Sequence, residues 1–388
     1  MLKNHLNRSS YRMIENLNGI SKNAACVAVN QATEELIHSN DLTKILNPRN
    51  YCGIILIDGK YNPVKETAGK VAAGLVPRSA KRGSTKKGLV TIPCMDYLSH
   101  DIVIYEVCLS ENSYEIAKIF QQLKDIGYPL KAIVCDESMG QIVEVARRFF
   151  PDVIIQICLT HYSKTIERTF VCNSAKRTYR SLQKQLDYIG ASPLISTHYY
   201  DREKALKLTN QMADLEVEYC YLWQAQSLFQ ELFWKVKNSE ELEIWEDKFN
   251  EAISKMDLKN YRHAKKIKDR YNDYYEKRDM IIASILHPGL NIPKTTNLIE
   301  GFNSTTLEMR FTTIRGFEKE KYARNYINAL ILKYRFHKFT DCRGKFKHLN
   351  KKSPLQIANP KNTLGFDFEN GDWIQFCKNL KNSSAIRP

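Results

Sequence analysis

Two apolar stretches of strand length, each ending on an aspartate, constrain the fold of this chain more than any other feature. Residues 51–58 read YCGIILID, and residues 130–136 read LKAIVCD. A continuous apolar run of this length predicts a strand buried inside a sheet. An acid directly after such a strand is rigidly held and can still reach a site. We therefore predict two central strands that present Asp58 and Asp136 at their exposed ends.

The segments around these runs follow a regular order. Alternation and helical spacing predict two strands, a helix, a second helix and a last strand, at residues 90–92, 102–109, 113–126, 140–150 and 153–159. We expect the first two to be antiparallel neighbours of the first central strand, and Ser113 is a suitable N-cap for the first helix. A set of antiparallel strands followed by alternating helices and strands is the layout of an RNase H-like fold. The expected fold class is α/β, with a mixed sheet as its core.

Residues 1–45 are expected to form a short helical segment ahead of the core. Residues 10–37 predict two short helices, with Gly19 in the turn between them and Ser21 as the N-cap of the second. This pattern fits a helix-turn-helix, whose second helix, at about residues 22–36, would enter a DNA major groove. A plain helical hairpin is the alternative, since too few residues precede the pair to complete a three-helix module.

The core is expected in two parts, separated by a large all-α insertion. Residues 163–287 are rich in Tyr, Lys, Glu and Leu and poor in Gly and Pro, which predicts several amphipathic helices. The first part of the core then spans residues 50–162, and core helices at residues 288–340 follow the insertion. Residues 341–388 form a polar tail that we expect to pack on the core.

A third acid, Glu300, lies on the polar face of a helix expected to start near Thr295 or Thr296. The side chains of Asn297 and Asn303 share that face, and apolar side chains follow the other. An acid among amides in a basic chain favours a site, although a solvated helix face would give the same pattern.

Three carboxylates suffice for one kind of chemistry. Phosphodiester transfer by two divalent metal ions needs hard oxygen ligands around ions ~3.5–4 Å apart. Asp58, Asp136 and Glu300 can supply these ligands, and the cofactors expected are two Mg²⁺ or Mn²⁺ ions. Taken singly, each aspartate has an ordinary explanation, because Asp58-Gly59 is a common hairpin-turn dipeptide and Asp136 could cap the next helix. Their shared position at strand ends favours the site.

The charge of the chain indicates a polyanionic partner. Lys and Arg number 58 against 43 Asp and Glu, which gives a net charge of +15. Nucleic acid is the leading candidate, although basic enzymes and membrane-surface proteins share such a charge. No stretch approaches ~18 consecutive apolar residues and the start has no signal-peptide pattern, so we expect a soluble, intracellular protein without a membrane partner. The ten cysteines include no CxxC pair, which predicts neither a zinc ribbon nor a disulfide framework.

Three separated blocks also follow the pattern of a known family. They are Asp58-Gly59 after its strand, residues 132–164 (AIVCD, then FFPDVIIQICLTHYSK from 149), and residues 297–303 (NLIEGFN). In this order they resemble the Mutator-like transposases and the related bacterial insertion-sequence transposases. The resemblance covers about residues 50–340. No clear zinc element or full DNA-binding module precedes residue 50, which leaves recognition of specific end sequences open.

The resemblance implies a DDE catalytic triad of Asp58, Asp136 and Glu300 in an RNase H-like core. The implied activity is metal-dependent nicking of the ends of a mobile element and joining of the freed 3′ hydroxyl to target DNA. The partners would be double-stranded DNA, both element ends and target, and at least a second copy of the chain, by analogy with enzymes that bring two ends together. The compartment would be the cytoplasm and nucleoid of a prokaryote or the nucleus of a eukaryote.

The resemblance further implies that residues around the triad support it. Its Cys-x-x-His element with a nearby basic residue corresponds to Cys158, His161 and Lys164, and its last block contains Asn297 and Asn303. A strand-end pair packed in the core is the alternative for the cysteine and histidine. No second pair at ligand spacing completes a zinc site with them.

Basic and aromatic side chains are candidates for contact with DNA. A basic loop contains Arg78, Lys81, Arg82, Lys86 and Lys87. A long helix expected at residues 317–339 carries Lys319, Lys321, Arg324, Lys333, Arg335 and Lys338. We expect only some of these to touch DNA, since most charges in such runs are merely solvated.

Three tryptophans at Trp223, Trp234 and Trp245 would align on one face if a single helix ran through all of them. Packing inside the insertion is one explanation, and stacking of one ring on a base unpaired at the cut end is the other. The expected function is thus a DNA transposase. A catalytically idle DNA-binding or regulatory protein and a DNA nuclease of the same fold are the alternatives, and the three intact acids count against the first.

Overall fold

The computed structural model divides the chain into two compact units, which we describe separately. The core unit comprises Met1–Ile155 and Thr295–Pro388, and the helical unit comprises Gln156–Lys294. The helical unit extends beyond both ends of the insertion expected at residues 163–287. The structure describes residues 1–7, 9–64, 88–137, 140–170, 172–189, 199–256, 264–314 and 317–383.

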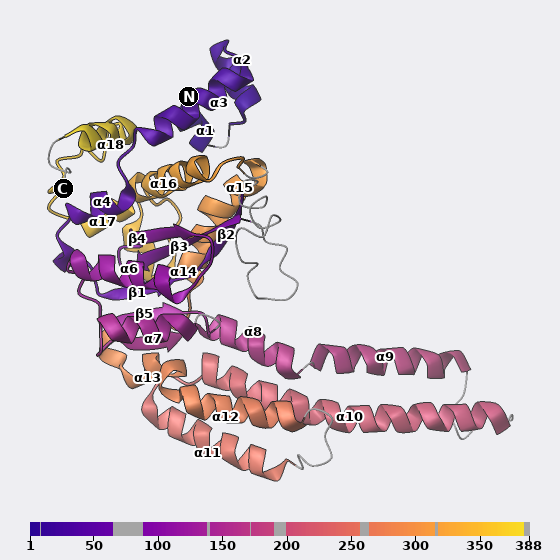
Figure 1. The fold of residues 1–388 in the computed structure, drawn as a ribbon. Helices are drawn as coiled ribbons and strands as arrows, with labels where there is room; N and C mark the ends of the chain where they lie inside the picture. The colour runs from indigo at the N-terminus through magenta and orange to yellow at the C-terminus, as the bar shows by residue number, and fades with distance from the viewer. Residues whose placement is uncertain are drawn as a thin grey trace. The chain divides into compact units, whose positions relative to one another are not determined.

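A six-stranded mixed sheet lies at the centre of the core unit (Figure 1). Its strands are β1 (Ile54–Ile57), β2 (Lys60–Pro63), β3 (Gly88–Asp96), β4 (Ile102–Cys108), β5 (Ala132–Cys135) and β6 (Ile154–Ile157). They run in the order β2-β3-β1-β5-β6, and β4 also pairs with β3. Because β1 pairs antiparallel with β3 and parallel with β5, it is the strand at which the sheet changes from antiparallel to parallel.

The sheet departs from the sequence prediction in two respects. β4 is antiparallel to β3 and does not pair with β1, so only one of the two expected antiparallel neighbours lies beside the first central strand. β2 was not predicted, because its sequence KYNP is polar and ends in proline. It becomes a strand through its antiparallel pairing with β3, directly after the break at Asp58 and Gly59.

Helices cover this sheet and form the two ends of the core unit. They are α1 (Leu2–Leu6), α2 (Tyr11–Asn18), α3 (Lys22–Glu34), α4 (Ser39–Lys44), α6 (Ser113–Asp125), α7 (Gly140–Phe149), α14 (Asn297–Phe302), α15 (Met309–Ile314), α16 (Glu320–Phe336), α17 (Pro354–Ala358) and α18 (Trp373–Asn382). Short 3-10 helices lie at Pro48–Asn50 and Gly344–Leu349, and a π-helix at Asn303–Glu308.

The caps of these helices show why they begin and end where they do. Gly19 ends α2 with a positive φ of 64°, which glycine adopts without strain. The Ser21 hydroxyl then accepts a hydrogen bond from the backbone N–H of Ala24 and starts α3, as predicted. The predicted cap of α6 was wrong, because the side chain of Asn112 accepts the capping bond from the backbone N–H of Glu115.

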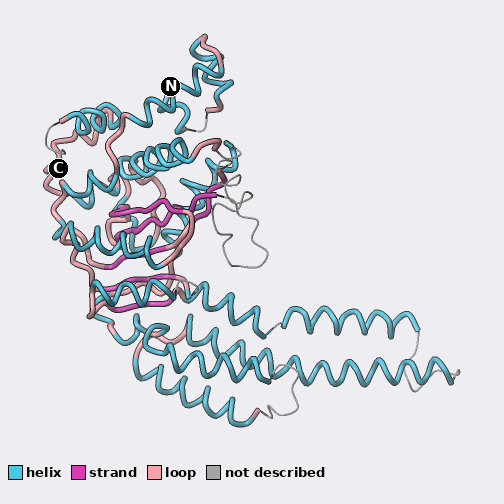
Figure 2. The backbone as a smooth tube through the Cα atoms, viewed as in Figure 1, coloured by secondary structure: helices cyan, strands magenta, loops and turns pink. Residues whose placement is uncertain are grey.

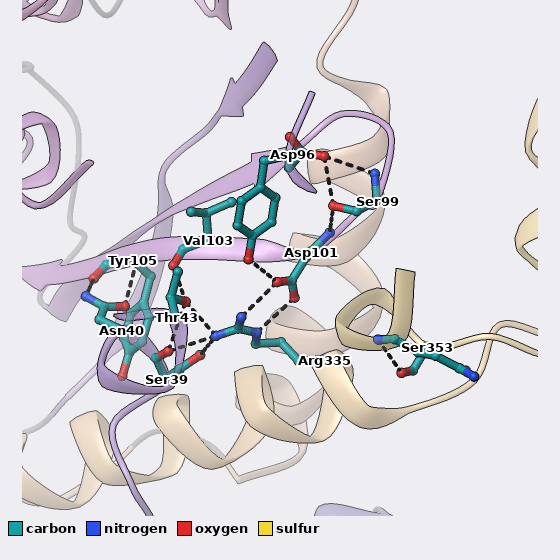
Figure 3. A network of polar contacts seen from close by, with 12 residues as sticks. Ser39, Asn40, Thr43, Asp96, Ser99, Asp101, Val103, Tyr105, Arg335 and Ser353 are labelled. Carbon is teal, nitrogen blue, oxygen red and sulfur yellow. Dashed lines mark hydrogen bonds and ion pairs between the residues drawn. The ribbon is translucent and has the colours of Figure 1, made fainter. Parts of the chain in front are cut away.

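A buried ion pair fastens α16 to the turn before β4 (Figure 3). The Arg335 guanidinium donates to both carboxylate oxygens of Asp101, at 2.8 and 2.7 Å, and both side chains are fully buried. Its remaining nitrogen donates to Ser39 and Thr43 on α4, and the Tyr51 hydroxyl donates to Asp101 at 2.9 Å. The prediction of Arg335 as a phosphate contact was therefore wrong, because α16 turns this side chain into the protein interior.

The helical unit is an array of helices around an aromatic core. It contains α8 (Leu159–Phe170), α9 (Cys172–Ile189), α10 (Tyr199–Trp234), α11 (Ser239–Lys255), α12 (Ala264–Ile281), α13 (Ala283–Leu286) and a 3-10 helix at Pro288–Leu290. Figure 2 shows the long helices of this unit running side by side. Buried rings of Tyr162, Phe229, Phe249 and Tyr274 meet at its centre.

Two further observations concern the whole described chain. All ten cysteines are free thiols, and most of them are buried. Among the helices that the structure describes, none is both long and apolar enough to span a membrane.

Candidate active site

The first two predicted acids lie at the same edge of the sheet. Asp58 directly follows β1 and Asp136 directly follows β5. The two strands are parallel, and Leu56 lies opposite Val134, so both acids come two residues after the same paired position. Neighbouring strands lie ~4.8 Å apart. The two half-buried aspartates are therefore neighbours across the carboxyl ends of β1 and β5.

The block around the third acid reaches this edge through Asn303. The Nδ2 atom of Asn303 donates a 2.8 Å hydrogen bond to Oδ2 of Asp58, across 245 residues of sequence. Glu300 lies one helical turn before Asn303, and side chains three positions apart share a helix face with β-carbons ~5–6 Å apart. Glu300 is therefore on the face of α14 that meets the end of β1.

A local hydrogen bond holds the Glu300 carboxylate. Thr296, which we expected as an N-cap, does precede the first residue of α14, but its hydroxyl makes no capping bond. It donates instead to Oε1 of Glu300 at 2.9 Å, and Thr296 is fully buried. The threonine thus restrains the acid, while its backbone carbonyl accepts the first bond of the helix.

Asn303 has an amide oxygen that this arrangement does not satisfy. Only 3% of the residue is exposed, and no donor among the described residues bonds to its Oδ1 atom. Burying an unpaired polar atom costs about 1–3 kcal/mol. Amide and carboxylate oxygens are the ligands that hard divalent cations take. Asp58, Asp136, Glu300 and Asn303 therefore carry the oxygen atoms that could bind a divalent metal ion.

A π-helix begins at Asn303 and continues the chain away from the acids. Wide turns of this kind inside helices are frequent at functional sites. Glu308 in the π-helix forms a 2.6 Å ion pair with Lys60 of β2, which ties the helix to the strand beyond Asp58. Because Glu308 is about half exposed, this pair contributes little to stability.

Sequence reasoning missed a fourth acid beside Asp58. The carboxylate of Glu111 lies against Gly59, where a Cβ atom would meet its Oε1 at 1.6 Å. Glu111 comes from the loop between β4 and α6, which no motif singled out. Its only sequence signal is the glycine after Asp58, because the absence of a side chain there leaves room for another group.

The remaining predicted support residues belong to both units. Asn297 is exposed at the start of α14. Cys158, His161 and Lys164 belong to the helical unit. Within that unit, Cys158 is fully buried between β6 and α8, His161 is half-buried in the first turn of α8, and Lys164 is exposed one turn later.

The structure describes some of the predicted DNA contacts. Arg78, Lys81, Arg82, Lys86 and Lys87 lie outside the described residues. On α16, Lys321 is exposed and pairs with Glu34 at 2.5 Å, and the Arg324 guanidinium donates to the backbone carbonyl of Val107. These two side chains have protein partners that a DNA phosphate would have to replace.

The three tryptophans do not lie on one helix. Trp234 is the last residue of α10, and Trp245 belongs to α11, so the condition for aligning all three rings on one face is not met. Trp245 is only 3% exposed and donates to the backbone carbonyl of Leu228 at 2.7 Å, so it packs inside the unit. Trp223 and Trp234 are 57% and 55% exposed.

Comparison with known proteins adds no assignment. The chain matches no protein-family model and no curated protein. What the site can do therefore follows from its residues, which are two aspartates at one sheet edge, an amide that bonds to one of them, a glutamate one helical turn before that amide, and a basic chain around them.

Proposed function

We propose that this chain is a metal-dependent DNA transposase in which Asp58, Asp136 and Glu300 are the catalytic carboxylates. The hydrogen bond from Asn303 to Asp58 carries the proposal, because it joins the last predicted block to the sheet edge that holds both aspartates. The aspartates could ordinarily be a turn residue and a helix cap. Those explanations do not account for a third polar block that bonds to one of them.

Some of these residues would bind the metal ions, and others orient the residues that bind them. Asp58, Asp136 and Glu300 would hold two Mg²⁺ or Mn²⁺ ions, with the Asn303 amide oxygen completing the set. When bound, such ions activate the attacking oxygen and neutralise the charge of the transferring phosphate. Asn303 fixes the orientation of Asp58, and Thr296 that of Glu300, so that neither carboxylate has to reorganise during the reaction.

Fold and charge support the same proposal. The sheet has an antiparallel set followed by parallel strands with α6 and α7 between them, the layout we associate with an RNase H-like core. The net charge of +15 suits binding to phosphates of double-stranded DNA. The resemblance to Mutator-like transposases rests on the same three blocks, and the helix pair α2 and α3 remains a candidate helix-turn-helix for reading element ends.

The test is a strand-transfer assay on the full chain. Linear DNA with the sequences that flank the chain's own coding region, labelled at the 3′ ends, is incubated with a target plasmid and Mg²⁺ or Mn²⁺. We expect nicked and joined products, and Asp58→Asn, Asp136→Asn and Glu300→Gln should each lower them by at least ~10²-fold. Glu308→Gln is the matched control, because it removes an acid from the same region outside the site.

Each outcome selects one explanation. Nicked DNA without joined product would identify a nuclease of the same fold. DNA binding without either product would identify the idle regulatory protein. Products that persist in all three acid variants would show that the catalytic residues lie elsewhere.

A further inference from the structure

We propose that Glu111 is a fourth carboxylate of the metal site, and that residue 59 is glycine because the Glu111 carboxylate needs its space. The inference rests on the proposed function for the identity of the site. It adds a ligand that neither the apolar strand runs nor the three family-like blocks contain.

The Glu111 carboxylate occupies the place that a side chain at Gly59 would take. An ideal Cβ atom at Gly59 would lie 1.6 Å from Oε1 and 2.8 Å from Cδ of Glu111. The next nearest atom, a methyl carbon of Val90 at 3.5 Å, would be in ordinary contact. The space at Gly59 is thus taken by one carboxylate and not by crowding of the sheet.

This contact places Glu111 within reach of the ions that Asp58 would hold. Gly59 directly follows Asp58, and consecutive Cα atoms lie ~3.8 Å apart. Two ions ~3.5–4 Å apart, with oxygen ligands at ~2.0–2.6 Å, have outer ligands ~8 Å from each other. Carboxylates at the ends of Asp58 and Glu111 can therefore belong to one two-metal site.

The loop that carries Glu111 is held on both sides. It follows the end of β4 and precedes α6, whose N-cap is Asn112. The backbone N–H of Asn112 donates to the carbonyl of Ser110 at 3.0 Å, and the Asn112 amide donates to the Ser110 hydroxyl at 3.0 Å. These bonds fix the main chain around Glu111, which lowers the entropy cost of holding its carboxylate at the site.

Glu111 and Asn303 approach the break between β1 and β2 at successive residues. Asn303 bonds to the side chain of Asp58, and Glu111 lies on Gly59. Asp58 and Gly59 form the break between the two strands, so the two groups meet the chain at adjacent residues of this break. The buried Oδ1 of Asn303, which has no hydrogen-bond partner in the described chain, independently indicates a ligand at this point.

A fourth acid would change what the site can bind. Like charges that share a site disfavour each other's ionised form, and a divalent cation removes that cost. Affinity for hard cations also rises with the number of charged ligands. Glu111 is therefore expected to tighten metal binding itself, before any DNA is present.

The experiment measures Mn²⁺ binding to the full chain without DNA, by titration calorimetry and by the electron paramagnetic resonance of free Mn²⁺. We expect Glu111→Gln to weaken binding by at least ~10-fold or to abolish one of two sites. Gly59→Ala keeps the acid but displaces it, because the clash involves only the end of a flexible side chain, and should weaken binding in the same direction. Glu115→Gln is the control, since it removes an acid from the first turn of α6 that pairs with Lys118.

The results separate this inference from the proposed function. If Asp58→Asn loses Mn²⁺ while Glu111→Gln and Gly59→Ala bind it as the unmodified chain does, Glu111 is no ligand and the three-acid site stands. If the unmodified chain binds no Mn²⁺, both the proposed metal-dependent function and the assignment of Glu111 are wrong. Weaker binding in both variants with an unchanged Glu115→Gln supports Glu111, and thermal unfolding of each variant verifies that it is folded.

Discussion

The two units of the molecule have interiors of different kinds. In the helical unit, aromatic rings pack on each other, with Phe229 and Phe249 at 5.0 Å between ring centroids and Trp245 stacked on Phe249 at 4.7 Å. In the core unit, the interior holds the fully buried ion pair of Arg335 and Asp101. Both interiors rest on area removed from water, and the core unit adds a fully buried pair of charges.

A second buried acid shows how far the core unit depends on such partners. Asp96, only 1% exposed, accepts hydrogen bonds from the hydroxyls of Tyr128 and Ser99 and from the backbone N–H of Cys52. Ring packing tolerates several geometries, whereas a buried charge is stable only with all its partners in place. The core unit therefore depends on these partners to keep its buried charges stable.

The largest effect should come from breaking the buried ion pair. Burial raises the pKa of Asp101, and Arg335 is the charge that opposes this effect. Arg335→Met leaves Asp101 buried without its counter-charge, which should cost about 3–5 kcal/mol of stability. Hydrogen exchange of the full chain, read peptide by peptide in urea, should show this loss in the core unit and little of it in the helical unit.

The double variant Arg335→Met with Asp101→Leu is the control for this comparison. Because it removes both charges, most of the lost stability should return. An equal loss in both variants would mean that the polar groups around the pair, and not the pair itself, determine the stability of the core unit.

The sequence predicted those parts of the fold whose signal is local. β1, β5, the α2–α3 turn and the limits of α6 follow from apolar runs and from residues such as Gly19 that end helices. The break between α10 and α11 also has a local signal in the sequence, the N-cap of α11. Asn238 caps α11 by accepting from the backbone N–H of Glu241, a spacing typical of helix starts.

The candidate site could be predicted only in part. Asp58 and Asp136 follow from strand ends, but their being neighbours depends on the parallel pairing of β1 with β5, which apolar runs do not specify. The bond from Asn303 to Asp58 spans 245 residues. Glu111 had no pattern of its own, because the contact that places it is visible only once the sheet has formed.

As the pH is lowered, the core unit should lose stability at a higher pH than the helical unit. Burial lowers the pKa of His5 and of His100 to about 4, whereas an unfolded histidine titrates near ~6.5. Between these values the unfolded chain binds protons that the folded core unit does not, so stability falls as pH falls. At about pH 5.5 each histidine should already cost about 1 kcal/mol.

The helical unit provides the comparison for this pH effect. Burial acts to raise the pKa of Glu246, but hydrogen bonds from Arg278 and Tyr274 lower it overall, so its contribution is lost only as pH falls through that lowered pKa. Hydrogen exchange at pH values between 7 and 5 should therefore show opening of the core unit first. His100→Asn, which suits the positive φ of 57° at this position, should reduce the difference, and an unchanged difference would exclude His100 as its source.

The smallest effect concerns a single ring of the helical unit. Trp245→Phe keeps an aromatic side chain but removes the hydrogen bond to the carbonyl of Leu228, which should cost about 1–2 kcal/mol. Trp223→Phe, on the exposed surface of α10, should change stability by less than about 0.5 kcal/mol. If both variants unfold at the same temperature, the buried hydrogen bond contributes nothing, and ring packing alone holds this interior. If Trp245→Phe is the less stable by the expected margin, even the aromatic interior of the helical unit depends on one satisfied polar atom, and the contrast with the core unit is one of degree.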